Sequence, residues 1–253
     1  MTPIPTLPQI KSWSLSRLGD YDTCPFRAKC KIIDRLPEPG SAAKDNGTRV
    51  HALAAAWVLR RVPQTDRETA HLREELARVA RARTIPPELA SFREEFAELR
   101  RPGAGARCEE QWAFDEAWGP TDWFGPRAWL RMKVDVHRLV AVKEGARRET
   151  VVAIADYKTG KERPDHALQR SLYALGALIM YPDAARATAA HWYLDAGKEG
   201  GPEVWERSQL PDLKREWTNR SRAMLGDRTF SPTPGRHCSW CAFSKEKGGP
   251  CRY

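Results

Sequence analysis

The chain has 253 residues, of which 41% are hydrophobic and 30% charged, a composition typical of one globular domain or of a domain with an appended subdomain. These values exclude collagen-like and intrinsically disordered chains. No apolar stretch approaches the roughly 20 residues that cross a bilayer, so we expect no membrane partner. The N-terminal segment lacks a basic stretch followed by an apolar run, so we predict no signal peptide and a cytoplasmic (intracellular) protein.

The charge balance indicates an anionic partner. Lys and Arg number 42 against 33 Asp and Glu, which gives a net charge of +9 at pH 7. A positive surplus favours a polyanion, with nucleic acid considered ahead of a membrane surface. The 6 cysteines are too sparse for a disulfide framework, and most of them lie near the two ends of the chain. This distribution predicts a metal or cluster site that joins the chain ends.

The first part of the chain is predicted to be helical. Apolar residues at helical spacing within 14–31 predict a short helix that ends near Cys24-Pro25. Pro, Gly and Ser predict a loop over 37–47, and the apolar face of 48–61 predicts a helix after it. Residues 65–101 read as charged surface helices with a break at Ile85-Pro86-Pro87.

Beyond Pro102-Gly103 the periodicity changes to the alternation that is typical of strands. Strands are predicted over 108–117, 129–142, 151–158 and 189–195, helices over 165–180 and 212–225, and a loop at Gly200-Gly201-Pro202. We expect the second and third strands to form a hairpin, or at least to be neighbours. Helices before and after a central group of strands indicate a mixed α/β layer architecture.

Two acids and a lysine on successive predicted strands form the main chemical signal. Asp156 and Lys158 are two residues apart on one strand, so their side chains project from the same face. If the strands are neighbours, Asp135 meets them there, and two carboxylates make a hard oxygen site suited to Mg²⁺ or Mn²⁺. An Asp-x-Lys tripeptide is more often a surface ion pair. Here the strand is otherwise apolar over 151–155, which favours a site for phosphodiester hydrolysis.

Four segments in order carry a family pattern: Gly47–His51 as G-x-x-x-H, Asp135 as the first metal-binding acid, Asp156-Tyr157-Lys158 as D-x-K, and Gln169–Tyr173 as Q-x-x-x-Y. With these motifs the chain resembles the PD-(D/E)XK nuclease superfamily, in its RecB-like exonuclease branch, which includes the cluster-bearing nucleases of CRISPR adaptation. The resemblance covers the chain from about Ser14 onward. It implies a restriction-endonuclease-like mixed β-sheet flanked by helices.

The resemblance also implies the roles of the motif residues. His51, Asp135, Asp156 and the carbonyl of Tyr157 would hold Mg²⁺ or Mn²⁺, Lys158 would assist the attacking water, and Gln169 and Tyr173 would position DNA. Gln169 and Tyr173 are four residues apart and so share one helix face. Core packing is the alternative for Tyr173 and for His51. Glu110, ahead of the Trp112 strand, is a candidate for a further acid.

The C-terminal cysteines form a second pattern. Cys238 and Cys241 make a C-x-x-C pair, and Cys251 adds a third thiolate, so that one more ligand would complete a site for zinc or an iron–sulfur cluster. The resemblance implies Cys24 as the fourth ligand of a [4Fe–4S] cluster, with zinc as the alternative metal. Cys30 competes with Cys24 for this place, and Cys108 is most simply a buried apolar residue.

These patterns predict one nuclease domain over 1–253, with a helical insert at 48–101 and a cysteine region formed by 14–31 and 226–253. The predicted function is a metal-dependent DNA nuclease, an exonuclease on single strands or duplex ends. The alternative is a non-catalytic, cluster-stabilised DNA-binding or adaptor subunit of a recombination or CRISPR adaptation complex. The partners are then DNA and other proteins of such a complex. Arginine-rich helices at 60–83, with Trp123 and Trp129, are candidates for DNA contacts.

Overall fold

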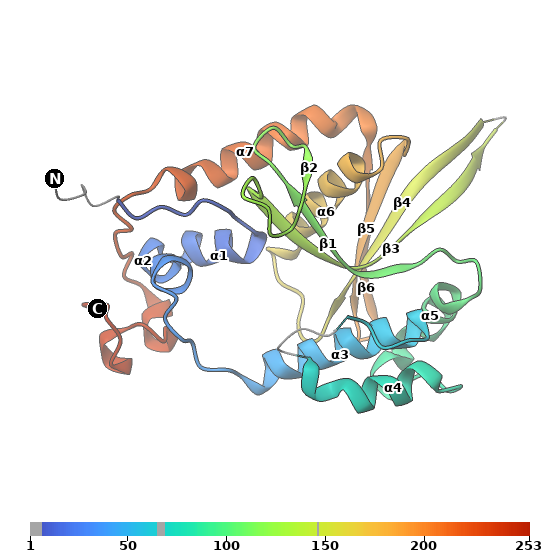
Figure 1. Ribbon diagram of the computed structural model, residues 1–253, viewed down its shortest axis with the longest axis horizontal. Helices are drawn as coiled ribbons and strands as arrows, with labels where there is room; N and C mark the ends of the chain where they lie inside the picture. The colour runs from blue at the N-terminus through green and yellow to red at the C-terminus, as the bar shows by residue number, and fades with distance from the viewer. Residues whose placement is uncertain (1–6, 65–68, 146) are drawn as a thin grey trace. The chain divides into compact units, whose positions relative to one another are not determined.

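The computed structural model describes residues 7–64, 69–145 and 147–253 (Figure 1). The chain divides into two compact units, and each is described by itself. The first, called here the cysteine unit, comprises Met1–Gly40, Ala113–Met132 and Arg215–Tyr253. The second, called the site unit, comprises Ser41–Trp112 and Lys133–Lys214. Among the described residues, no helix is both long and apolar enough to span a membrane.

A six-stranded mixed sheet with the order β2-β1-β3-β4-β5-β6 forms the centre of the fold. The strands are β1 (Arg107–Phe114), β2 (Pro120–Thr121), β3 (Leu130–Glu144), β4 (Arg147–Lys158), β5 (Arg186–Tyr193) and β6 (Lys198–Glu206). β3 and β4 pair antiparallel, which confirms the predicted hairpin. β4 and β5 pair parallel, and the crossover helix α6 (His166–Met180) connects them along the chain. The predicted mixed α/β architecture is therefore confirmed.

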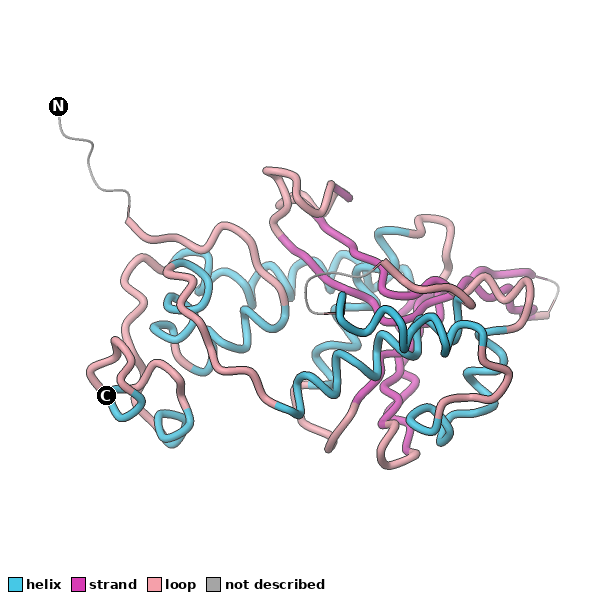
Figure 2. The backbone as a smooth tube through the Cα atoms, turned by 60° about the horizontal axis from the view of Figure 1, so that its bottom comes forward, coloured by secondary structure: helices cyan, strands magenta, loops and turns pink. Residues whose placement is uncertain are grey.

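Helices cover both faces of the sheet in the site unit (Figures 1 and 2). They are α3 (Ala42–Leu59), α4 (Arg73–Arg81) and α5 (Arg93–Arg100), with short 3-10 turns at Ala70–Leu72 and Pro87–Phe92, and α6 on the opposite face. α3 and α5 bury Trp57 and Phe96 against Tyr157 of β4 in one apolar cluster. Because side chains alternate along a strand, the neighbours of Tyr157 at 156 and 158 point to the α6 side.

Helix α3 begins at Ala42, six residues before the predicted start at Thr48. The predicted loop over 37–47 is therefore wrong in its second half. Ser41 caps the helix by accepting a hydrogen bond from the Lys44 backbone N–H, and the alanines that follow have high helix propensity. Of the predicted charged helices, residues 65–68 lie outside the described residues, and the break before Pro87 is present between α4 and the turn at Pro87–Phe92.

The predicted loop at Gly200–Pro202 is also wrong, because these residues lie within β6. β6 pairs antiparallel with β5, and the pairing register shifts between Ala189 and His191. Gly201 has a φ of +103°, and a Cβ there would lie 3.0 Å from the Ala189 carbonyl oxygen. The glycines thus allow a bulge and a close backbone approach in a paired strand, a use of glycine that resembles a loop signal in the sequence.

The cysteine unit is built around stacked tryptophans. It contains α1 (Leu15–Thr23), α2 (Pro25–Ala28), a π-helical turn at Lys29–Ile33, most of α7 (Leu210–Gly226), and short turns at Arg236–Trp240 and Lys245–Lys247. Trp13 stacks on Trp217 with ring centroids 5.9 Å apart, and Trp129 meets Trp13 edge-on at 5.4 Å. Since Trp129 is buried in this cluster, its side chain is not available for the DNA contact predicted for it.

Candidate active site

The side chain of Asp135 takes the place of a backbone acceptor at the end of the β3–β4 pairing. Regular pairing between these strands ends at Val136 and Ala155. One residue further, the backbone N–H of Tyr157 donates to Oδ2 of Asp135 at 2.8 Å. The carboxylate therefore satisfies a buried backbone donor where the strands cease to pair. Asp135 and Asp156, both buried, are thereby placed side by side at the end of the hairpin.

His51 reaches this point from helix α3. Its Nδ1 lies 3.2 Å from Oδ1 of Asp135, and its ring meets the ring of Tyr157 edge-on with centroids 5.8 Å apart. The helix is held over the sheet by the apolar cluster that includes Val50 and Tyr157. The predicted proximity of His51 to the acids of the hairpin is thus present in the structure.

Glu109 of β1, which the sequence reasoning missed, lies with these two residues. One ligand atom each of His51, Glu109 and Asp135 lies within 4.8 Å of the others, the only such group of three among the described residues. The acid suggested from the sequence, Glu110, instead accepts a hydrogen bond from Trp112 Nε1 at 3.2 Å and lies near His137.

The backbone explains the difference between the two glutamates. Glu109 has a φ of +58°, a left-handed conformation that costs a non-glycine residue about 1–2 kcal/mol. This kink interrupts the alternation of β1, so that Glu109 rather than Glu110 faces Asp135. No feature of the sequence predicts a left-handed glutamate within a strand, although such strain is commonly found at functional sites.

Asp156 is held by side chains from β4 and α6. Its Oδ1 accepts hydrogen bonds from the Tyr173 hydroxyl at 2.7 Å and from Gln169 Nε2 at 3.1 Å. Its Oδ2 forms an ion pair with Nζ of Lys158. Gln169 Nε2 also donates to the Tyr173 hydroxyl at 2.8 Å, so these two residues share one helix face as predicted. Both direct their polar groups at Asp156.

The ionisable groups of the site shift one another's pKa values. Burial, followed by the charge of Asp135, raises the pKa of Asp156 to about 6, and the same two causes raise the pKa of Glu109. Burial alone would lower the pKa of His51, but Asp135 outweighs it and raises that pKa to about 9. The imidazolium in turn holds the pKa of Asp135 below its usual value against the effect of burial. Three carboxyl groups thus face one imidazolium and two ammonium groups, because Lys133 pairs with Glu109 and Lys158 pairs with Asp156.

Two carboxylate oxygens at the site have free lone pairs. Oε1 of Glu109 is buried without a hydrogen-bond partner in the described part of the chain, and Oδ2 of Asp156 is buried with no hydrogen bond besides its ion pair with Lys158. A buried, unsatisfied carboxylate oxygen is costly unless a cation binds it. Three carboxylates and one imidazole make a predominantly oxygen donor set, which suits Mg²⁺ or Mn²⁺ better than a soft metal ion. The residues present therefore fit a divalent cation.

Comparison with known proteins places the chain in a family. Residues 12–245 match the profile of the PD-(D/E)XK nuclease superfamily. The chain belongs to this superfamily. A search of curated proteins finds no match. Among solved structures, a protein from Eubacterium rectale described as a "putative exonuclease" is similar, with 14% identity, a TM-score of 0.47, and coverage of 91% of this chain and 87% of that one. The structure of SSO0001 is similar with 13% identity, a TM-score of 0.31, and coverage of 85% and 90%.

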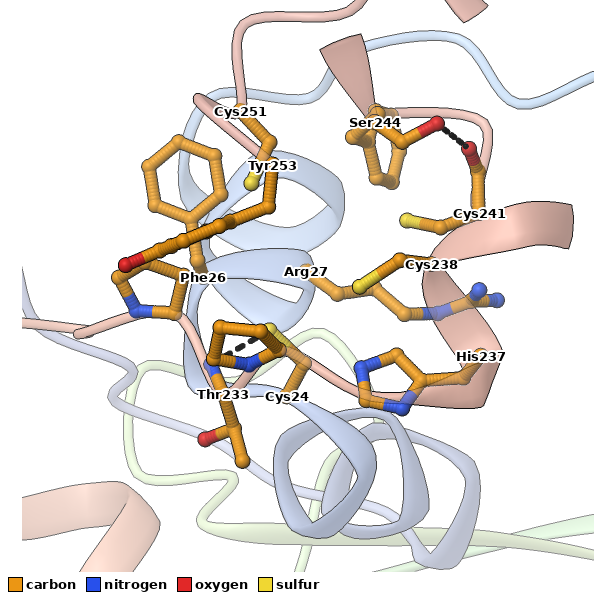
Figure 3. A pocket seen from close by; sticks show the side chains of 13 residues that line it. Cys24, Phe26, Arg27, Thr233, His237, Cys238, Cys241, Ser244, Cys251 and Tyr253 are labelled. Atoms are coloured by element: carbon orange, nitrogen blue, oxygen red, sulfur yellow. Dashed lines mark hydrogen bonds between the residues drawn. The ribbon is translucent and has the colours of Figure 1, made fainter. Parts of the chain in front are cut away.

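In this superfamily member, four of the cysteines line one pocket of the cysteine unit (Figure 3). They are the predicted ligands Cys24, Cys238, Cys241 and Cys251. Their sulfur atoms point into the pocket (Figure 3), and backbone N–H groups of Thr233 and Gly235 lie 3.5 Å from the sulfur of Cys24 and 3.4 Å from that of Cys238, respectively.

The predicted closed four-sulfur site is not formed in the structure. Across residues 7–64, 69–145 and 147–253, no three cysteine sulfurs lie within 4.8 Å of one another. Tetrahedral zinc with bonds of about 2.3 Å would hold its sulfurs about 3.8 Å apart. The expectation of clustered cysteines is therefore corrected to four sulfurs that face a common pocket at wider spacing.

The remaining cysteines have other surroundings. Cys30 packs against Cys241 and Phe243 in a small apolar cluster and is not among the residues that line the pocket. Burial, followed by the charge of Asp34, raises the pKa of its thiol to about 11, so that Cys30 is a neutral core residue here. Cys108 of the site unit is partly buried against the apolar cluster around Tyr157, which agrees with the apolar role expected of it.

Proposed function

We propose that the chain is a divalent-metal-dependent deoxyribonuclease of the RecB-like exonuclease branch. The observation that carries the proposal is the gathering of His51, Glu109 and Asp135 within 4.8 Å of one another, at the end of the hairpin that also carries Asp156 and Lys158. These groups come from α3, β1, β3 and β4. A fold that collects them around the buried Asp135, and leaves Oε1 of Glu109 without a hydrogen bond within the described residues, has the properties of a cation site.

His51, Glu109, Asp135 and Asp156 would hold the ion, with the Tyr157 carbonyl as a further ligand. When bound, Mg²⁺ or Mn²⁺ supplies Lewis acidity toward a phosphoryl oxygen and acidifies water. Lys158 lies beside Asp156 with a fifth of its side chain exposed, so its ammonium group can orient the attacking water or neutralise charge that develops on the phosphate. Tyr173 and Gln169 hold Asp156 in place through hydrogen bonds, and contact of either with the substrate stays a prediction.

The proposed substrate is DNA, as single strands or duplex ends. The net charge of +9 supports a polyanion. A direct test is digestion of end-labelled single-stranded DNA with Mn²⁺ by the native chain and by Asp156→Asn, with circular single-stranded DNA of the same sequence beside it. The proposal expects the native chain to digest the linear strand and to leave the circle intact. Binding of DNA by the native chain without any digestion would instead favour the non-catalytic adaptor.

We further propose that Cys24, Cys238, Cys241 and Cys251 bind a [4Fe–4S] cluster. All four sulfurs face one pocket, and N–H groups near Cys24 and Cys238 resemble the hydrogen bonds to sulfur that tune such clusters. The resemblance to the cluster-bearing nucleases is the ground for a cluster over zinc.

Anaerobic purification followed by iron, sulfide and zinc analysis tests this assignment. The proposal expects about four iron and four sulfide per chain, with loss of both in Cys241→Ser and retention in Cys108→Ser. Cys108 is the matched control because it lies in the site unit, outside the pocket. Stoichiometric zinc without sulfide would assign the alternative metal.

A further inference from the structure

Four polar residues form a series of contacts beside Asp156, and only Gln169 among them has a role in the proposed function. The members of the series belong to β5, α6 and β6 of the site unit: His191, Gln169, Arg170 and Glu203. His191 pairs in register with Asp156 across the parallel β4–β5 ladder and is fully buried. A fully buried imidazole is costly unless its ring nitrogens have hydrogen-bond partners.

The carboxamide of Gln169 has a defined orientation. Its Nε2 donates to Oδ1 of Asp156 and to the Tyr173 hydroxyl, so its Oε1 points the other way. That oxygen lies 3.3 Å from Nε2 of His191. Because an amide oxygen only accepts hydrogen bonds, His191 Nε2 must carry the hydrogen of this contact.

Arg170 fixes the other nitrogen of the same ring. Its Nη1 lies 2.9 Å from Nδ1 of His191. A guanidinium only donates, so Nδ1 must be the unprotonated acceptor, and a neutral ring then carries its hydrogen on Nε2. Arg170 is itself held by Glu203, whose Oε1 accepts from Nε at 3.0 Å and also from Nη2. Glu203 is partly exposed, so the series of contacts begins at the surface of β6.

We infer that His191 is a positioning residue for Asp156: Arg170 locks its ring in the Nε2–H tautomer, and the ring then locks the Gln169 carboxamide that orients the Asp156 carboxylate. The inference rests on the proposed function, because it assigns the series a role in orienting the Asp156 carboxylate, whose Oδ2 also lies 3.5 Å from Nε2 of His191, toward a cation. Second-layer residues that orient a metal ligand in this way typically change metal affinity about 10- to 100-fold when they are removed.

The tautomer can be measured without any variant or metal. A long-range ¹H–¹⁵N correlation spectrum of the ¹⁵N-histidine-labelled native chain at pH 7 distinguishes the two neutral tautomers from the imidazolium. The inference expects the Nε2–H tautomer for His191, and Arg170→Met should abolish the preference. An Nδ1–H tautomer or an imidazolium in the native chain would overturn the inference.

The positioning role is tested by Mn²⁺ binding to the DNA-free chain, measured by calorimetry. His191→Phe and Arg170→Met should raise the Kd by about 10- to 100-fold, and the milder Glu203→Gln, at a partly exposed position, should raise it severalfold. His166→Phe is the matched control. His166 is buried with its ring centroid 5.2 Å from that of His191, but its Nδ1 bonds the Tyr193 hydroxyl at 2.7 Å. The Kd of His166→Phe for Mn²⁺ should stay within about twofold of the native value, since the positioning contacts of His191 remain.

The outcomes separate this inference from the proposed function. If Asp156→Asn loses Mn²⁺ affinity while His191→Phe binds as the native chain does, the inference is overturned and the nuclease proposal stands. If Asp156→Asn itself keeps native affinity, the cation site and the inference fail together. If His191→Phe and His166→Phe lose affinity equally, the effect is general destabilisation, and the positioning role is overturned.

Discussion

The imidazole Nδ1 of His51 lies 3.2 Å from the carboxylate Oδ1 of Asp135, although 84 positions separate the two residues in the chain. The contact joins the helix that covers one face of the sheet to the end of the β3–β4 hairpin. Since Oδ2 of Asp135 accepts the Tyr157 backbone N–H at the same time, this carboxylate connects helix, strand end and candidate cation site. The consequences of the arrangement can be tested individually.

Asp135→Asn should abolish Mn²⁺-dependent digestion. The amide retains the size of the side chain and an acceptor for the Tyr157 N–H, but it removes the negative charge that binds a cation. We expect a decrease in the rate of more than about 100-fold, beyond the usual effect of losing an outer-layer contact, with a circular dichroism spectrum like that of the native chain. The control is Asp165→Asn, at an exposed position before α6, which should digest DNA at the native rate. Native activity of Asp135→Asn would contradict the assignment.

Glu109→Gly should be more stable than Glu109→Ala by about 1 kcal/mol, because the φ of +58° strains alanine but not glycine. At Glu110, which has no positive φ, the order should reverse, with alanine the more stable by about 0.5–1 kcal/mol. Urea unfolding of the four variants measures both differences. Equal stabilities of the two Glu109 variants would show that the left-handed conformation is not imposed by the fold. Both Glu109 variants should bind Mn²⁺ more weakly than the native chain.

Gly249→Ala should disorganise the cysteine tail. A Cβ at this position would overlap the carbonyl carbon of Phe243, and two residues later the Cys251 N–H donates to the Phe243 carbonyl at 3.0 Å. Forced overlap of this kind typically costs about 1–3 kcal/mol. Thermal unfolding should show the loss, and metal analysis should show reduced occupancy of the cysteine pocket. Gly226→Ala is the control, because a Cβ there meets nothing within 4 Å.

Asp227→Asn should destabilise the cysteine unit at neutral pH but not in acid. Asp227 accepts hydrogen bonds from the backbone N–H groups of Thr229 and Phe230 and from the Tyr21 hydroxyl. Burial alone would raise the pKa of this carboxyl, but the backbone donors outweigh it and hold the pKa below 3.8. A lowered folded-state pKa contributes stability above the unfolded pKa, and this contribution is lost as the pH falls through the folded value.

Melting temperatures of the native chain and of Asp227→Asn should therefore differ at pH 7 and converge below about pH 4, where unfolded aspartates become protonated. Asp183→Asn, at an exposed position, should leave the melting temperature unchanged at both pH values. A constant difference between the native chain and Asp227→Asn at every pH would show that the charge of the carboxylate contributes nothing.

The spacing of residues along the chain predicted the site more accurately than it predicted where strands and loops begin and end. Asp156 and Lys158 are two residues apart on an apolar strand, and Gln169 and Tyr173 are four apart on a helix, so backbone periodicity alone predicts that each pair shares a face. Gly200 and Gly201 misled the same reasoning. Glycine signals a loop and a close backbone approach alike, and only the neighbouring strand β5 decides between them.

The sequence by itself determined the hairpin with its acids, the helix that follows it and the three C-terminal cysteines of the pocket, because these depend on periodicity and on residue chemistry. Only the tertiary structure decided that Glu109 rather than Glu110 joins His51 and Asp135. It also decided that His191 and Arg170 form the series of contacts that reaches Asp156 through Gln169. Those choices depend on a left-handed backbone and on packing between segments far apart in the chain. Neither leaves a periodic trace in the order of the residues.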